Sequence, residues 1–225
     1  DALPICLASL IRVSDPISAL SEAPVLAHVE RSGFVESVHR AIAVEVAADG
    51  AVTRRFGDVD APHFPRSSNK PMQAIGMLRS GLDLPPDLLA LACASHSGEQ
   101  IHLDGVQRIL AGAGLPVATL QNTPDLPYGE QARLSWIRSG HDKESITQNC
   151  SGKHAAMLAT CVAAGWSVDG YLDPEHPLQV AIRDTVAETV GEVTHTTVDG
   201  CGAPLFAVPL SGLAAAFGRL AAADP

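Results

Sequence analysis

The stretch Gln148–His154 holds the side chains best suited to catalysis or metal binding, because a thiol, a hydroxyl, an amine and an imidazole surround one glycine. An alanine- and leucine-rich run follows, so we expect Ser151 to cap the start of a helix. Cys150 and Lys153 are then three residues apart, a spacing that lets two side chains converge at the first helical turn. The alternative is a capped helix that buries an ordinary cysteine.

A further candidate ligand, Cys201, lies much later in the chain. Together with Cys150 and Lys153 it offers two thiolates and one nitrogen, close to the sulfur and nitrogen donors that zinc prefers. A lysine ligand binds only as the neutral amine, which a strong local cation makes feasible. The residues alone leave two interpretations open, a zinc site and a pair of core cysteines.

A Ser-x-x-Lys pattern, Ser67 to Lys70, stands where we expect another helix to begin, with Ser67 as the N-cap and Pro71 in the first turn. The spacing places hydroxyl and amine on one face. Lys70 can act as a base if burial and the helix dipole lower its pKa from about 10.4. Ser67 is then a nucleophile, and Arg66 beside it suits a substrate carboxylate. The alternative is a capped helix with a solvated lysine.

Ser95 belongs to a third polar stretch, Cys93–Glu99, which also contains His96. It follows the apolar run Leu88–Ala92, which we interpret as a buried strand. The hydroxyl of Ser95 would therefore emerge at a strand end. The alternative is a polar turn that caps the next helix.

The surrounding pattern predicts a mixture of strands and helices. Asp49-Gly50 is a hairpin turn signal, and antiparallel strands early in the chain argue against a doubly wound parallel sheet. Residues 114–147 are expected to be mostly loop, anchored at 134–137. Strands are predicted at residues 25–29, 41–46, 51–56 and 196–198, and helices at residues 67–78, 101–113, 155–164, 177–190 and 205–223.

Composition describes a compact globular protein, with 46% hydrophobic and 18% charged residues among 225. We predict an arm at residues 1–23 and one domain at residues 24–225. The net charge of −10 argues against nucleic acid or an anionic membrane as a partner. No run approaches the roughly 18 apolar residues of a membrane span. Five cysteines without disulfide-framework spacing predict reduced thiols in the cytoplasm.

Five segments, in this order and spacing, resemble the asparaginase II family, the L-asparaginases of the Rhizobium etli type. The resemblance covers about residues 25 to 225, and Cys150-Ser151-Gly152-Lys153-His154 is its most specific part. It implies hydrolysis of L-asparagine to L-aspartate and ammonia. It also implies an α+β fold like that of serine β-lactamases, with a mixed, mostly antiparallel sheet flanked by helices, and a homodimer. The segments are residues 35–40, 66–71, 93–97, 149–154 and 199–201.

The resemblance also implies roles for individual residues. Ser67 corresponds to the nucleophile, Lys70 to its base, and Ser95 to the serine of a second Ser-Lys pair. The implied zinc ion tunes substrate binding rather than activating water. Its ligands would be Cys150, Lys153 and Cys201, while Arg66, His154 and Asp199 would arrange the charged groups of the substrate and support the metal.

In the family, the lysine partner of the second serine comes from a more C-terminal segment. No lysine follows Lys153 in this sequence, so we expect a chain that is incomplete at its C-terminus. One alternative is a non-catalytic member that binds zinc or an amino acid. Another is a penicillin-recognising serine enzyme, but its Ser-Asp-Asn and Lys-Thr-Gly boxes are absent. The preference between asparagine and glutamine is a question of pocket depth and stays open.

Overall fold

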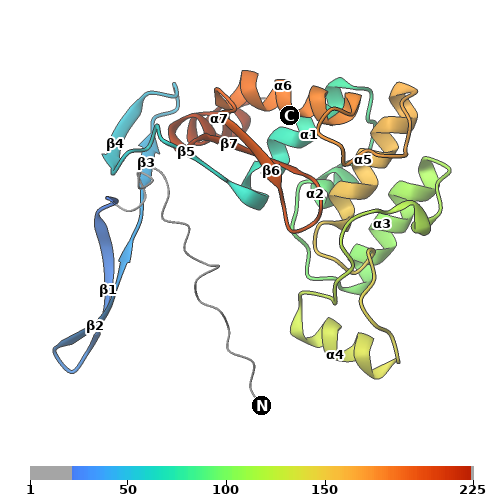
Figure 1. Cartoon of the computed structure of the whole chain (residues 1–225), viewed down its shortest axis with the longest axis horizontal. Helices are drawn as coiled ribbons and strands as arrows, with labels where there is room; N and C mark the ends of the chain where they lie inside the picture. Colours follow the sequence, from blue (N-terminus) through green and yellow to red (C-terminus); the bar gives the residue numbers. More distant parts are fainter. Residues whose placement is uncertain (1–21, 224–225) are drawn as a thin grey trace, which may run out of the picture.

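The computed structural model describes residues 22–223, in which a helical body stands beside two β-hairpins (Figure 1). Among these residues, no helix has both the length and the apolar character that crossing a membrane requires. The helices are α1 (Lys70–Arg79), α2 (Pro86–Ala92), α3 (Gln100–Gly112), α4 (Glu130–Arg138), α5 (Ser151–Ala164), α6 (Pro177–Val190) and α7 (Leu210–Ala222), with the short 3₁₀ helices η2 (Arg66–Asn69) and η3 (Val117–Thr119).

Helix α5 is the centre of the body, and it packs against α1, α2, α3 and α6. Its apolar residues Ala155, Met157, Leu158 and Cys161 are completely buried. Burial on several sides explains why the helix is apolar around most of its circumference. The polar residues at its N-terminus are therefore held against the core.

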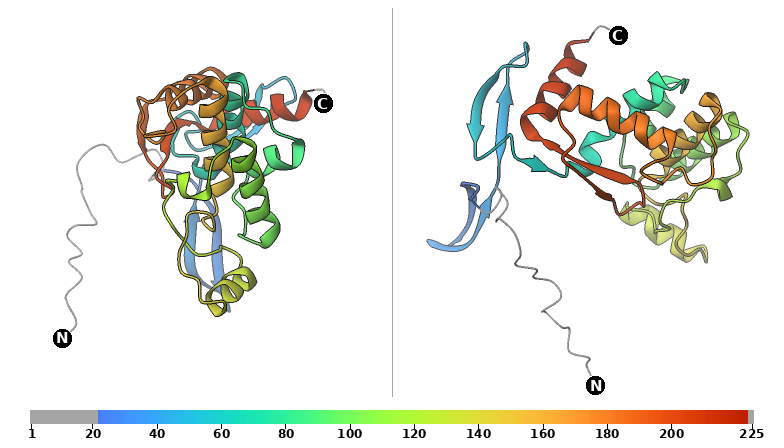
Figure 2. Two further views of the ribbon diagram at one scale, coloured as in Figure 1. Left: turned by 90° about the vertical axis from the view of Figure 1, so that its right-hand side faces the viewer. Right: turned by 45° about the horizontal axis from the view of Figure 1, so that its top comes forward.

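The strands form three small antiparallel sheets. In the three-stranded sheet, β7 lies between β5 and β6 and is the buried strand, whereas β6 is exposed along its whole length. The β1–β2 ribbon extends away from the helices (Figure 2). Every residue of both strands is exposed. The strands are β1 (Val25–Arg31), β2 (Phe34–Arg40), β3 (Ala43–Val46), β4 (Val52–Phe56), β5 (Pro62–His63), β6 (His195–Val198) and β7 (Pro204–Pro209).

Several sequence predictions are confirmed. The mixed α+β class is correct, and the Asp49-Gly50 turn joins β3 to β4, with Asp49 Oδ1 accepting a hydrogen bond from the Ala51 N–H. Helices α3, α5 and α6 lie where they were expected, and Gly114 ends its helix segment with a φ of 71°. The serine β-lactamase-like architecture stays a prediction. The predicted arm, residues 1–23, lies outside the described residues except for its last two positions, of which Ala23 is buried.

The prediction of a strand at Leu88–Ala92 is wrong, because these residues belong to helix α2. Pro86 fits the first turn of a helix, where a backbone N–H has no partner to lose. Leu88, Leu91 and Ala92 are buried at helical spacing and face the body. Ser95 therefore follows a helix end rather than a strand end.

The predicted helix at residues 205–223 is wrong in its first part. Pro204–Pro209 is strand β7, and helix α7 begins only at Leu210. This strand is buried between its two neighbours, and a strand in that position has a continuous apolar sequence. Such a run cannot be distinguished from a buried helix by its pattern alone. Pro209 occupies the N-cap position of α7 and separates the two elements.

Both predicted serine caps are also wrong. Ser67 lies inside η2, and α1 begins at Lys70 with Pro71 in its first turn, as expected. Ser151 is the first residue of α5, and Cys150 occupies the N-cap position. The Ser151 hydroxyl instead donates to the carbonyl of Ile146, so it ties the helix start to the preceding loop.

Gly152 lets α5 approach α2 closely, and this contact can be tested by mutation. A Cβ at Gly152 would lie 2.8 Å from the backbone oxygen of Leu91. We expect Gly152→Ala to lower the free energy of unfolding by about 1–3 kcal/mol, because the backbone of α2 must move. Urea denaturation measures the change. Gly112→Ala, where nothing lies within 4 Å, is the control and should be neutral or stabilising. Equal effects of the two substitutions would contradict the close approach.

Candidate functional site

Lys70 is the buried cation of the site, with only 1% of its surface exposed. Its Nζ lies 2.5 Å from the carbonyl oxygen of Ala94 and 3.0 Å from the hydroxyl of Ser95. Burial lowers the pKa of this amine below its ordinary value, and the nearby charge of Lys153 adds to the effect. The structure thus pairs a buried amine with the hydroxyl of Ser95, which is itself exposed.

Ser67, by contrast, lies on the exposed surface of η2. The backbone N–H of Lys70 donates to its carbonyl oxygen, so the two residues are one 3₁₀ turn apart. The hydrogen bond of the Lys70 side chain, however, goes to Ser95. The pairing of Ser67 with Lys70 therefore stays a prediction, and the structure adds a contact between Lys70 and the second predicted serine.

Arg66 and Asp199 form an ion pair beside Ser67, with 2.8 Å between Arg66 Nε and Asp199 Oδ1. The arginine side chain is 66% exposed and the aspartate side chain only 11%. Arg66 has a φ of 52°, a left-handed conformation that costs a non-glycine residue about 1 kcal/mol. The ion pair joins η2 to the turn that leads into Cys201. It places one positive and one negative charge next to the candidate nucleophile.

Cys150, Lys153 and Cys201 are all buried, and the structure brings them together as the family resemblance implied. Lys153 Nζ lies 3.4 Å from Cys201 Sγ. A hydrogen bond from Cys201, with the charges of Lys70 and Lys153, outweighs burial and lowers the pKa of the Cys150 thiol to about 5. The same hydrogen bond raises the pKa of Cys201. One thiolate is therefore already favoured between two amines.

Lys70 connects this sulfur cluster to Ser95. The negative charge of Cys150 raises the pKa of Lys70 and so offsets part of the effect of burial. The candidate catalytic residues and the candidate metal ligands are consequently one continuous group of side chains. In the sequence, the candidate catalytic residues and the candidate metal ligands stand in separate stretches.

His154 lies behind the cysteines and is completely buried. Its Nδ1 is 2.9 Å from the hydroxyl of Tyr171, which accepts a hydrogen bond from the backbone N–H of Gln121. The other ring nitrogen, Nε2, is buried and has no hydrogen-bond partner among the described residues. Burial is the main reason that the pKa of His154 falls to about 4, so the ring is neutral at physiological pH. The roles of His154 in supporting the metal site and in contacting substrate both stay predictions.

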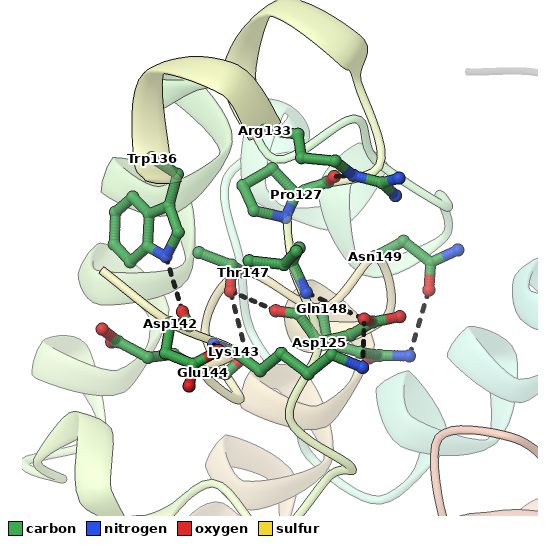
Figure 3. Close-up of polar contacts among 11 residues, drawn as sticks. Asp125, Pro127, Arg133, Trp136, Asp142, Lys143, Glu144, Thr147, Gln148 and Asn149 are labelled. Atoms are coloured by element: carbon green, nitrogen blue, oxygen red, sulfur yellow. Dashed lines mark hydrogen bonds and ion pairs between the residues drawn. The ribbon is translucent and has the colours of Figure 1, made fainter. Parts of the chain in front are cut away.

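A network of amide side chains, to which the sequence pattern assigns no role, positions Cys150. The side-chain oxygen of Gln148 accepts hydrogen bonds from the Cys150 N–H and from Asn122. Its amide nitrogen donates to Asn149 Oδ1 over 3.0 Å, and the Thr147 hydroxyl binds the carbonyl of Asp125 (Figure 3). These buried amides are common in protein cores, so their spacing in the sequence carries no signal of their role.

The donor set fits a small cation with an affinity for sulfur. Within residues 22–223, no group of three histidine, cysteine, aspartate or glutamate side chains could hold a metal ion by itself. Two sulfurs and the Lys153 amine do converge, however, in a buried space with a thiolate already favoured. Such a set could hold zinc if Lys153 binds as the neutral amine.

A cavity of about 600 Å³ opens beside Ser95, between α2 and α3. Leu88, Leu91 and Ile101 contribute its apolar lining, and an ion pair between Arg108 and Asp87, 2.7 Å long, lies at the same cavity. Ser95 is therefore accessible both to solvent and to a small organic molecule.

A comparison with known protein families connects this geometry to an identity. The family model described as L-asparaginase II matches residues 27–225. No curated protein sequence matches the chain. The matched region contains all nine residues predicted for the site, which lie on or beside η2, α1 and α5, in the loop after α2 and in the turn after β6. The chain belongs to the L-asparaginase II family.

Proposed function

We propose that the chain hydrolyses the side-chain amide of L-asparagine, giving L-aspartate and ammonia. Family membership supports an amidohydrolase that acts on a small molecule. The observation that carries the proposal is the buried Lys70 amine, 3.0 Å from the Ser95 hydroxyl and one 3₁₀ turn after Ser67. A buried amine with a lowered pKa is the base that a serine nucleophile requires.

In the proposed reaction, Ser67 Oγ attacks the side-chain carbonyl carbon of the substrate, and its proton passes to neutral Lys70. Lys70 then returns the proton through the Ser95 hydroxyl to the departing nitrogen, which leaves as ammonia. Water hydrolyses the resulting ester and restores Ser67. The exposed position of Ser95 against the lysine suits it for this relay. Ser95 is therefore the proton carrier of the second step.

Arg66 and Asp199 would hold the charged groups of the amino acid. The exposed guanidinium is available for the substrate carboxylate, and the partly buried aspartate for the ammonium. Their mutual contact keeps both charges oriented when no substrate is bound. The choice between asparagine and glutamine depends on the distance from these charges to Ser67.

Zinc would be held by Cys150, Lys153 and Cys201, with the buried, neutral His154 supporting the site. When bound, the ion supplies a positive centre that attracts and orients the substrate. We further propose a cytoplasmic homodimer. In the described part of the chain, Cys93, Cys150, Cys161 and Cys201 are all free thiols, as a reducing compartment requires.

A second candidate is a family member that binds zinc or an amino acid without turnover. The observation that favours it is the contact of Lys70 with Ser95 rather than Ser67. A penicillin-recognising enzyme has no comparable support. Ammonia release from L-asparagine separates catalysis from binding alone.

Ser67→Ala is the first test of the proposed nucleophile. We expect ammonia release from L-asparagine to fall at least about a thousandfold, because no acyl-enzyme forms. Ser68→Ala removes the neighbouring exposed hydroxyl and should keep nearly full activity. Both variants are compared with the unsubstituted chain in the same ammonia assay. Full activity in Ser67→Ala would overturn the proposed nucleophile.

The lowered pKa of Lys70 predicts the direction of the pH dependence. As a base the lysine must be neutral, so kcat/KM should rise with pH and level off below the ordinary lysine pKa of about 10.4. Lys70→Arg keeps the positive charge but cannot lose its proton, so we expect activity to be lost at every pH. Steady-state rates across the pH range measure both effects. Activity in Lys70→Arg would exclude the lysine as the base.

Cys201→Ala tests the zinc site independently of turnover. We expect roughly one zinc per unsubstituted chain, and loss of the metal in the variant because one thiolate is missing. Elemental analysis after dialysis measures the stoichiometry. Cys161→Ala is the matched control, since Cys161 is also buried and its pKa is raised by burial to about 11. Equal zinc content in the two variants would rule out Cys201 as a ligand.

A further inference from the structure

His96 is a buried histidine, 4% exposed, that links two parts of the site and has no role in the proposed reaction. Its Nε2 lies 2.8 Å from the hydroxyl of Ser151, the first residue of α5. Its backbone N–H donates to the carbonyl of Asn149 over 3.1 Å. The loop after α2 is therefore attached to the start of α5 by both side chain and backbone.

The hydrogen bonds determine where the imidazole proton lies. The Ser151 hydroxyl lies 2.7 Å from the carbonyl oxygen of Ile146, which can only accept. The single hydroxyl proton therefore points at Ile146, and Ser151 must accept from His96. The proton of the neutral imidazole is consequently on Nε2.

The second ring nitrogen, Nδ1, is buried and has no hydrogen-bond partner among the described residues. An unsatisfied buried acceptor is unfavourable, so an apolar side chain could fill the same space at lower cost. The hydrogen bond from Nε2 to Ser151 is thus what the imidazole provides and an apolar side chain would not. The ring also stacks on His102, with 5.2 Å between centroids, which restricts its rotation.

The attachment lies directly beside both candidate clusters. Ser95 precedes His96 in the chain, and Cys150 precedes Ser151. Ser95 contacts Lys70 Nζ, and so does the carbonyl of Ala94. A shift of the loop relative to α5 would therefore change the position of Ser95 against Lys70 and of Cys150 against the same amine.

We propose that His96 is a positioning residue, whose hydrogen bond to Ser151 fixes the positions of Ser95 and Cys150 around Lys70. The inference rests on the proposed function in one respect, that Ser95 takes part in turnover. It assigns His96 no contact with substrate. The imidazole acts by fixing the distance between two groups that approach the lysine from different elements.

Two substitutions distinguish this hydrogen bond from simple packing. The side-chain amide of glutamine reaches the place of Nε2 and can donate to Ser151, whereas the shorter asparagine cannot. We expect His96→Asn to lower kcat for L-asparagine at least about tenfold, with KM and the unfolding temperature little changed. His96→Gln should recover most of kcat. His102→Gln alters the stacking partner and leaves the hydrogen bond to Ser151 in place, so it is the matched control.

Ser151→Ala removes the acceptor and should repeat the effect of His96→Asn. If the two side chains act as one unit, the double variant should be no slower than either single variant. Additive losses, or equal kcat in His96→Gln and His96→Asn, would overturn the positioning role.

A measurement without turnover separates this inference from the proposed function. The rate at which iodoacetamide alkylates Cys150 in the zinc-free chain can be followed by peptide mass spectrometry. We expect His96→Asn, but not His96→Gln, to change this rate at least about threefold, because Cys150 shifts relative to Lys70. The same pattern in a chain that releases no ammonia would refute the asparaginase proposal and support the positioning of Cys150. Equal alkylation rates in the two variants would refute the positioning role.

Discussion

The site depends on the burial of one amine, that of Lys70. A lysine side chain removed from water needs partners, and here a carbonyl, a hydroxyl and a thiol surround it. These three partners come from the loop after α2 and from the start of α5. Because each partner must reach the same nitrogen, the amine fixes how the two elements stand relative to η2. The arrangement of the site therefore follows from the need to surround the buried Lys70 amine with polar groups.

The helical body provides the rigid support that such an arrangement needs. Helix α5 is buried on several sides, and its N-terminus approaches α2 at Gly152 without space for a Cβ. The polar residues Gln148 and Asn122 hold the preceding turn through buried hydrogen bonds. Packing thus determines the position of the helix, and the amide network determines the direction in which Cys150 points. Both are required before two thiols can meet Lys153.

The sequence predicted which residues gather, but not all of their contacts. Cys150, Lys153 and Cys201 lie together, as the family resemblance implied, whereas the residues alone left a pair of core cysteines open. The contact between Lys70 and Ser95 was not predicted, because Leu88–Ala92 was interpreted as a strand although Pro85 and Pro86 favour a helix start there. Short apolar runs fit either structure, and only tertiary packing decides between them. The same ambiguity concealed β7, while α3, α5 and α6, each followed closely by a glycine, were found correctly.

The position of β6 at one end of its sheet has a consequence for assembly. β6 pairs with β7 on one side only, and within residues 22–223 no strand pairs with its other side. The outward N–H and C=O groups of Thr196 and its neighbours are therefore a template on which another strand can be hydrogen-bonded. β6 also leads directly into the Asp199 turn. A strand added at this edge would stiffen that turn from outside, so the geometry around Arg66 would respond to any polypeptide that pairs with β6.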